Sequence, residues 1–199
     1  MLTVVACDND PAKGAPKVEA TAAQPVSAPA TGAVKYVFDA TGSKVEFTGA
    51  KVSGKHDGSF GTLSGTVELV DGDPTKSSVS VDIDVSSMKI EPAKLADHLK
   101  SKDFFEVETY PKAKFTSTAV KAGGSDGATH TVTGNLELHG QTKSITFPAT
   151  IRADGEGVTV KANFAINRKD FGIVYPGMPD DLIKDDVLIR LDIAAKKSK

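Results

Sequence analysis

Val158-Thr159-Val160-Lys161-Ala162-Asn163-Phe164-Ala165-Ile166 is the longest run in the chain with an apolar side chain at every second position. Successive side chains of a β-strand point to opposite faces, so this period of two predicts a strand with one apolar face. Runs of the same kind lie on both sides of it, at 45–47, 79–85, 132–138, 145–151 and 187–193. The alternation predicts about eight substantial strands and a short first strand near 36–39.

Turn-forming residues separate these runs. Gly, Asp, Pro and other turn residues cluster at 71–74, 123–127, 139–141 and 154–157, and they allow the backbone conformations that tight turns need. Short turns join antiparallel neighbours, because parallel strands need long crossovers. The sheet is therefore predicted to be antiparallel.

One segment, 91–99, has a helical pattern instead. Pro92 suits a first helical turn, and Leu95 and Leu99 lie four residues apart on one helix face. The sequence thus predicts an all-β protein with one short helix insertion.

The apolar face of so large a sheet must be covered, either by closure into a barrel or by folding into a sandwich. We predict an antiparallel eight-stranded, lipocalin-like barrel, which is wide enough to hold one ligand. Gly134, Ala149 and Ala162 are small residues on the predicted inner face and favour spare room inside. Large side chains facing them would fill the same space, so the alternation alone leaves a hollow and a filled interior equally open.

Composition and motifs argue against several classes of function. The net charge is -2, so the chain has no electrostatic footprint for nucleic acid. No run of 18 or more apolar residues occurs, so no helix is expected to span a bilayer. The four His lack metal-ligand spacing, and neither a Gly-x-Ser-x-Gly elbow nor a Walker loop occurs. We therefore predict no catalytic and no metal-binding residues. His98 is expected to hydrogen-bond within the corner after the helix rather than to contact a ligand.

The start of the chain has a different character. Val4-Val5-Ala6-Cys7 resembles a bacterial lipobox, whose cysteine is acylated, so residues 1–7 are interpreted as the remnant of a lipoprotein-type signal. The upstream part is too short for a signal peptide, so this interpretation requires a start upstream of Met1; the alternative is an incidental cysteine. Residues 8–33 hold four Pro among Ala, Ser, Thr and Lys and are predicted to be a disordered linker. The folded domain is expected at 34–199.

Four segments resemble the signature of the YceI-like family, and they occur in the family's order. They are His98–Phe105, Tyr110–Phe115, Gly134–Lys143 and Arg168–Gly172. The resemblance covers roughly residues 34 to 195. It implies a lipocalin-like barrel with a helix packed against it, a long polyisoprenoid chain bound in an apolar tunnel, and export to the periplasm.

Two positions depart from that signature. Leu95-Ala96-Asp97 stands where many members carry an Arg-Asp pair, so any role of that arginine at a head group does not transfer. Tyr175 stands where many members carry a Trp, so the loop 175–182 is expected to shape the mouth of the barrel differently.

Inward apolar side chains are the candidates for contact with a ligand chain. Phe104 and Phe105 are adjacent, so in an extended segment one lines the interior while the other pins the helix, unless both are ordinary core. Arg168 suits a pyrophosphate or quinone head, and equally a structural ion pair with Asp170 or Asp181. The predicted ligand-binding residues are Phe47, Phe60, Val81, Ile83, Met88, Leu95, Leu99, Phe104, Phe105, Phe115, Leu136, Phe147, Phe164, Arg168, Phe171 and Met178.

The sequence therefore favours a non-enzymatic protein of the bacterial envelope, periplasmic or anchored through Cys7. Its expected partners are a membrane and an isoprenoid quinone or polyprenyl phosphate, with no cofactor besides that lipid. The helix around Leu99 and the loop 175–182 are expected to frame the entry for the apolar chain, with Arg168 near its head. Two alternatives remain: an enzyme acting on a bound isoprenoid or quinone, and a ligand-free interaction module with a packed interior. The volume of any cavity inside the barrel distinguishes the ligand-free module from a lipid-binding protein.

Overall fold

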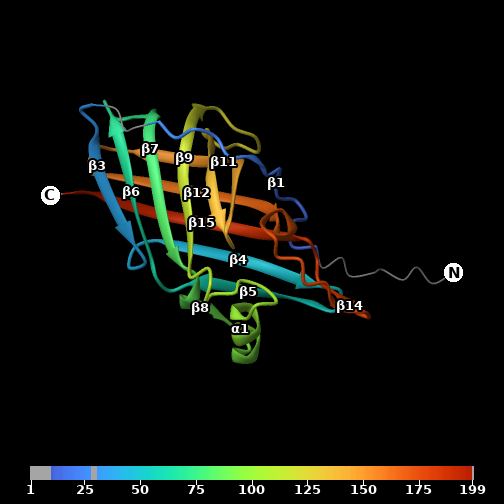
Figure 1. Ribbon diagram of the computed structural model, residues 1–199. Coiled ribbons are helices and arrows are strands. Elements are labelled where there is room, and N and C mark those ends of the chain that lie inside the picture. The colour runs from blue at the N-terminus through green and yellow to red at the C-terminus, as the bar shows by residue number, and fades with distance from the viewer. Residues whose placement is uncertain (1–9, 28–30, 199) are drawn as a thin grey trace.

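A computed structural model describes residues 10–27 and 31–198, and they form a closed antiparallel barrel (Figure 1). The predicted signal remnant and Cys7 lie outside the described residues. The barrel strands pair in the order β3-β6-β7-β9-β10-β11-β12-β15, and β15 pairs back onto β3. The prediction of an eight-stranded antiparallel barrel is confirmed. The barrel strands are β3 (Val34–Asp39), β6 (Leu63–Val70), β7 (Asp73–Asp84), β9 (Lys112–Ala122), β10 (His130–Leu138), β11 (Gln141–Ala153), β12 (Gly157–Asn167) and β15 (Asp186–Lys197).

One edge of β15 is shared by two strands. Lys196 and Lys197 pair with β3, whereas Leu188–Asp192 pairs with β4 (Lys44–Lys51). From β4 the sheet continues into β5 (Gly54–Phe60) and β8 (Met88–Ile90), which follows the short helix η1 (Val85–Ser87). These strands extend the wall beside β15, as Figure 1 shows.

Two of the predicted turns are two-residue hairpins. Asp71-Gly72 joins β6 to β7, and His139-Gly140 joins β10 to β11. All four residues have positive φ, from 51° to 71°. Such a pair of left-handed residues is what a type I′ turn requires, and its twist matches that of the strands it joins. The turn residues thus fix the antiparallel register of both hairpins.

The predicted helix is α1 (Ala93–Lys100), with Pro92 at its N-cap. Leu95 and Leu99 pack against an apolar cluster formed by Phe47, Val85, Met88, Ile90 and Ala113. Later in the chain, η2 (Arg168–Phe171) and a hairpin of β13 (Gly177–Met178) and β14 (Asp181–Leu182) separate β12 from β15. No helix in the described ranges has the length and hydropathy to cross a membrane.

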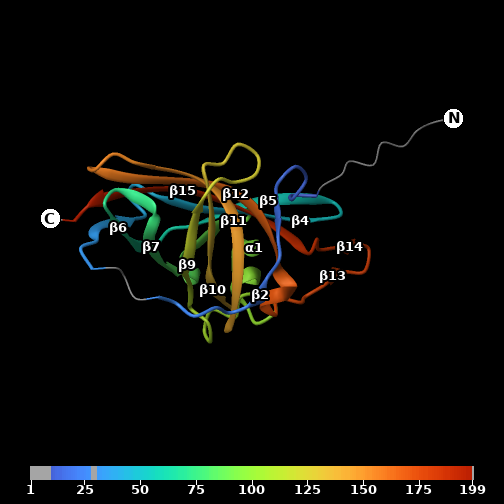
Figure 2. The same cartoon turned by 90° about the horizontal axis from the view of Figure 1, so that it is seen from above.

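The N-terminal segment differs from the prediction. Residues 10–27 do not behave as a free linker: β1 (Lys17–Val18) pairs in parallel with β12, and β2 (Thr21–Ala22) pairs with β11. Figure 2 shows this segment, in blue, running along the outside of the barrel beside β11. Val18 is buried in the main core cluster, and the amide of Asn135 bonds to the main chain of Gln24. The segment pairs with free edges of β11 and β12, and composition alone does not reveal such a pairing.

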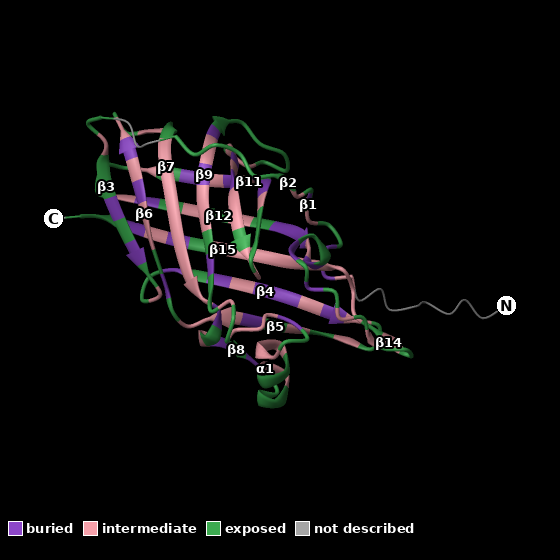
Figure 3. Cartoon of the chain, in the orientation of Figure 1, coloured by how far each residue is buried: buried purple, intermediate pink, exposed green. Residues whose placement is uncertain are grey.

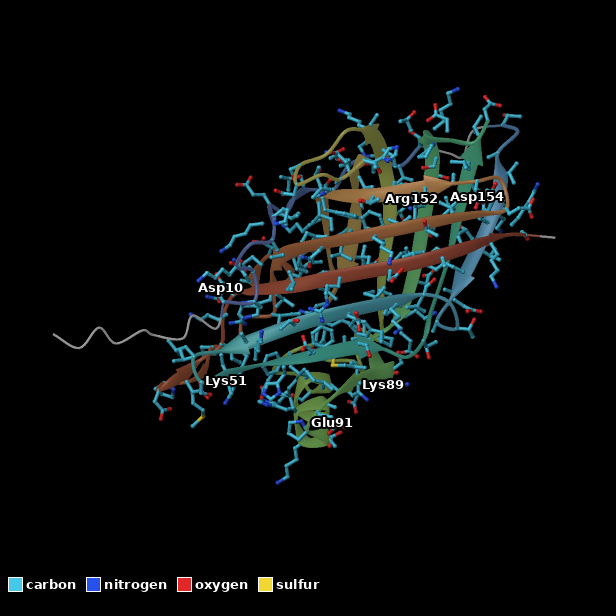
Figure 4. All side chains as sticks on the ribbon, turned by 180° about the vertical axis from the view of Figure 1, so that it is seen from behind. Asp10, Lys51, Lys89, Glu91, Arg152 and Asp154 are labelled. Carbon is cyan, nitrogen blue, oxygen red and sulfur yellow. The ribbon has the colours of Figure 1, made fainter. Side chains whose placement is uncertain are left out.

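Burial follows the alternation along several strands, whereas most of β7 is intermediate (Figure 3). In β11 the buried residues Ile145, Phe147, Ala149 and Ile151 alternate with more exposed ones. In Figure 4 Asp10 and Lys51 lie at one end of the molecule, and Arg152 and Asp154 at the opposite end. The inner faces of the strands enclose the main core between these ends.

Candidate functional site

The barrel interior is hollow. A cavity of ≈ 180 Å³ lies inside it, lined by 26 residues, of which 25 are hydrophobic and the other is Arg168. One water needs only roughly 10–15 Å³ of such space, and apolar cavities of this kind stay dry and take apolar guests. The question left open by the alternation is thereby answered in favour of a cavity.

The inner face of β7 shows the same emptiness. Val79, Val81 and Ile83 line the cavity and pack against the main core, yet they are only partly buried. In a filled barrel, side chains at these inward positions would be enclosed by neighbours, since protein interiors are close-packed. Their remaining exposed surface faces the hollow, so an apolar ligand would find apolar contacts already arranged.

Gly134, one of the three small residues predicted on the inner face, has a different role from the one predicted. A Cβ on Gly134 would lie 2.4 Å from the ring of Phe115, so this glycine makes room for a ring and leaves no void. Gly58 accommodates Phe47 in the same way, and a Cβ there would lie 2.3 Å from that ring. The far edges of these two phenylalanine rings therefore occupy the space that the glycines of the wall leave free.

Ten of the sixteen predicted ligand-binding residues line the cavity. They come from five barrel strands (β7, β9, β10, β11 and β12), from β4 and β5, from η2 and from the segment after α1. They are Phe47, Phe60, Val81, Ile83, Phe105, Phe115, Leu136, Phe147, Phe164 and Arg168.

The other six do not line it. Met88, Leu95 and Leu99 belong to the apolar cluster beneath α1, which is separate from the main core. Phe171 is fully buried in the main core. Met178 lies on the β13–β14 hairpin and is 62% exposed. The sixth residue, Phe104, is buried against other rings.

Those rings join α1 to the segment that follows it and to the segment that follows η2. His98 of α1, Phe104 and Tyr175 form a cluster with ring centroids 5.1 to 5.4 Å apart. Phe105, next to Phe104, lines the cavity, so the two adjacent rings point different ways as predicted. The Nε2 atom of His98 also lies 3.2 Å from a carboxylate oxygen of Asp103, in the corner where a structural bond was expected.

Arg168 has a structural role. It is 5% exposed and donates to the main-chain oxygens of Ile173 (2.7 Å) and Lys184 (3.1 Å). Its ion-pair partner is Asp185, at 3.2 Å, and not the predicted Asp170 or Asp181. Burial lowers the pKa of the guanidinium, and the charge of Asp185 opposes that shift. Its donors thus hold η2 to the start of β15, while part of the side chain reaches the cavity wall.

Some lining residues escaped the sequence reasoning. Phe38 on β3 and Ile173 after η2 both line the cavity. Phe38 alternates with Tyr36, and a Cβ on Gly65 across the sheet would lie 2.2 Å from the Phe38 ring. The alternation in β3 was a usable signal for Phe38. Ile173 lies outside any regular strand, so no periodicity points to it.

Residues 36–195 match the YceI-like domain. The chain belongs to the YceI-like family. Its sequence is 37% identical over 138 residues to the UPF0312 protein of Pseudomonas putida strain W619, which covers 66% of this chain and 71% of that relative. In fold it resembles the crystal structure of Burkholderia cenocepacia BcnA, with a TM-score of 0.66, 26% identity and coverage of 79% of this chain and 99% of that one.

A second solved structure has the same fold at lower identity. It is a polyisoprenoid binding domain from Saccharophagus degradans implicated in plant cell wall breakdown, with a TM-score of 0.65 and 16% identity, and it covers 83% of this chain and 99% of that one. The match to the YceI-like domain begins at residue 36, so residues 10–27, which pack on the barrel here, lie outside the matched range.

Proposed function

We propose that the protein binds the apolar chain of an isoprenoid lipid inside its barrel and sequesters or carries it. The observation that carries this proposal is the hollow interior: among the 26 residues of the described part of the chain that line it, Arg168 is the one ionisable residue. A ligand-free interaction module would have a packed interior. An enzyme would need converging reactive groups around its substrate, and this lining offers a lone guanidinium whose donors are engaged elsewhere. The polyisoprenoid binding domain from Saccharophagus degradans shares the fold and supports the choice of ligand class.

Chain length gives the proposal a quantitative test. At about 0.3 kcal/mol per heavy atom, each isoprene unit of five carbons adds about 1.5 kcal/mol, which is about tenfold in affinity. Displacement of N-phenyl-1-naphthylamine by geraniol, farnesol, geranylgeraniol and solanesol measures this dependence. Affinity is expected to rise with each unit until the cavity is filled. A flat series, or displacement by none of the four alcohols, would refute the proposal.

A blocking variant ties the binding to the cavity. Val81→Arg places a charge among apolar side chains, where an unpaired charge costs several kcal/mol, and fills the hollow. Ser80→Arg is the matched control, because Ser80 is the neighbouring residue of β7 and does not line the cavity. Val81→Arg should lose displacement while Ser80→Arg keeps it. Circular dichroism must show that both variants are folded, and a folded Val81→Arg variant that still binds would contradict the assignment.

The lipobox-like segment 4–7 supports a second proposal, which concerns the place of action. Cys7 in Val4-Val5-Ala6-Cys7 is acylated in the native host, and the barrel then works at a membrane surface in the bacterial envelope. A single acyl chain binds a membrane only marginally, so stable anchoring through Cys7 requires more than one acyl chain or a second contact with the membrane. Fractionation of cells that express the natural gene, with and without Cys7→Ser, tests this. Wild-type protein found wholly in the soluble fraction would contradict the anchor and leave the binding function intact.

A further inference from the structure

Strands β11 and β12 are paired along only part of their lengths. Their ladder covers only Ala149–Ala153 of β11 and Val158–Ala162 of β12. Beyond it, residues 141–148 still pair with β10 and residues 163–167 still pair with β15, but the pairing between the two strands stops. Pro148, which has no N–H to donate, stands immediately before the first paired residue. We call the two facing edges, 141–148 and 163–167, the seam.

The seam is covered by residues 16–22, which we call the strap. Ala165 of β12 donates to the main-chain oxygen of Pro16 at 2.8 Å, and Lys17 and Val18 pair with Ala165 and Ile166. On the other side Thr21 and Ala22 pair with Ser144 and Lys143. Ala165 and Ser144 point away from the cavity-lining side of their strands, yet they are 1% and 2% exposed. The strap therefore replaces the missing ladder and seals the outside of the wall.

The cavity lies directly behind the seam. Ile145 and Phe147 of β11 and Phe164 and Ile166 of β12 all line it. These side chains and the strap are what separates the hollow from solvent along this part of the wall.

The strap is held weakly compared with the strands it joins. Each of its two pairings is two residues long, and Val18 is its one buried side chain. The Lys17–Asp186 ion pair is largely solvent-exposed on the Lys17 side, and exposed ion pairs contribute little. Near Gly14 and Pro16 a hollow of ≈ 330 Å³ separates the segment from Pro148 and Ala162. Segments with few buried contacts are the first to open locally.

We infer that the seam is the entrance for the ligand's apolar chain, and that the strap is its removable cover. This inference rests on the proposed binding function. Release of the strap breaks two short pairings and uncovers a row of apolar side chains that leads into the hollow. The alternative is entry beside His98, Phe104 and Tyr175, where contacts among three rings hold their segments together.

A reversible disulfide tests the inference. Ala22 and Lys143 are direct partners in an antiparallel pair, so their Cα atoms lie about 4.5–5.5 Å apart, within the range of a disulfide. Ala22→Cys with Lys143→Cys, in the full chain with Cys7→Ser, staples the strap when oxidised. Thr133→Cys with Thr146→Cys is the matched control, because it staples β10 to β11 without touching the strap.

The readout is the rate at which a pyrene-labelled hexadecanol moves from phosphatidylcholine vesicles to the protein. Oxidation should slow transfer at least tenfold in the strap variant and leave the control unchanged, and reduction should restore the rate. Val18→Asp, which loosens the strap, should speed transfer several-fold. Equal rates in the oxidised and reduced strap variant would overturn the inference while binding persists. Failure of the reduced protein to take up the probe at equilibrium would overturn the binding function and the entrance together.

Discussion

Phe147 of β11 and Phe164 of β12 stack with ring centroids 4.3 Å apart and 13° between their planes. Extending the register of the β11–β12 ladder by two residues would pair these same positions, but the ladder ends at Ala149 and Ala162. The two side chains thus bridge the strands after the main-chain pairing has stopped. An aromatic contact of this kind is worth about 0.5–1.5 kcal/mol beyond the area it buries. It forms the inner layer of the seam, as the strap forms the outer one.

Phe164→Leu should therefore loosen the seam at modest cost in stability. The substitution keeps an apolar side chain but removes the stacking, so we expect the free energy of unfolding to fall by about 1 kcal/mol. Lipid transfer from vesicles should become several-fold faster. Phe60→Leu is the control. The ring of Phe60 on β5 also contacts another ring, that of Phe47 on β4, with 5.5 Å between the ring centroids. Acceleration by the control to the same degree would mean that any loss of ring packing speeds transfer.

Gly134→Ala should destabilise the barrel. A Cβ there would lie 2.4 Å from the ring of Phe115 and 2.6 Å from the main-chain oxygen of Thr116, so strand and ring must both shift. Overpacking of this kind costs about 1–3 kcal/mol. Gly49→Ala is the matched control, because a Cβ on Gly49 of β4 would meet nothing within 4 Å. Urea denaturation measures both, and equal stability of the two variants would contradict the close fit of the ring.

The fold was predictable from the sequence because it is determined by local features, namely the alternation within strands and the residues of the turns. Alternation in 158–166 and in the other runs places one face of each strand inside, and His139-Gly140 demands a tight hairpin. The closed barrel then follows from the need to cover one large apolar face. Pro92 and the Leu95–Leu99 pair predicted the helix, and the family resemblance implied that it packs against the barrel.

The cavity and the strap were harder to predict from the sequence, because they depend on distances between strands. Alternation cannot tell a hollow from a filled interior, and Gly134 misled because its space is taken by a ring from a neighbouring strand. The flexible side chain of Met178 suggested a ligand contact, yet Met178 is exposed and does not line the cavity. The strap has one buried residue, Val18, and such a weak apolar signal among prolines reads as disorder.

Arg168→Ala should lower stability strongly and should not discriminate between head groups. Removal of the guanidinium leaves the oxygens of Ile173 and Lys184 without a donor in a buried site, which costs about 1–3 kcal/mol for each group. Lys169→Ala is the control, because Lys169 also bonds to Asp185, at 2.9 Å, but is exposed. Its loss should stay within about 1 kcal/mol. A stable Arg168→Ala variant that loses only geranylgeranyl pyrophosphate, and still binds geranylgeraniol, would restore the head-group role.

Acid should lower the free energy of unfolding by protonating Asp57, which links β5 to Thr48 of β4 and to Arg190 of β15. The hydroxyl of Thr48 donates to this carboxylate and, together with Arg190 at 3.1 Å, holds the pKa of Asp57 below its ordinary value. A carboxyl group with a lowered pKa in the folded state stabilises the protein above its unfolded value of about 3.9. That contribution disappears as the pH falls through the lower, folded value.

Urea denaturation at pH 6 and at successive steps down to pH 2.5 measures this contribution. Wild-type stability should decline below about pH 4, the side of the unfolded pKa on which a depressed carboxyl group must take up a proton. Thr48→Val, which removes the largest cause of the shift, should lower stability at pH 6 and make the decline shallower. Asp57→Asn should do the same, and the double variant should lose less than the two single losses added together, since both remove one interaction. Strict additivity, or an unchanged acid decline in Asp57→Asn, would show that Asp57 is not held by Thr48.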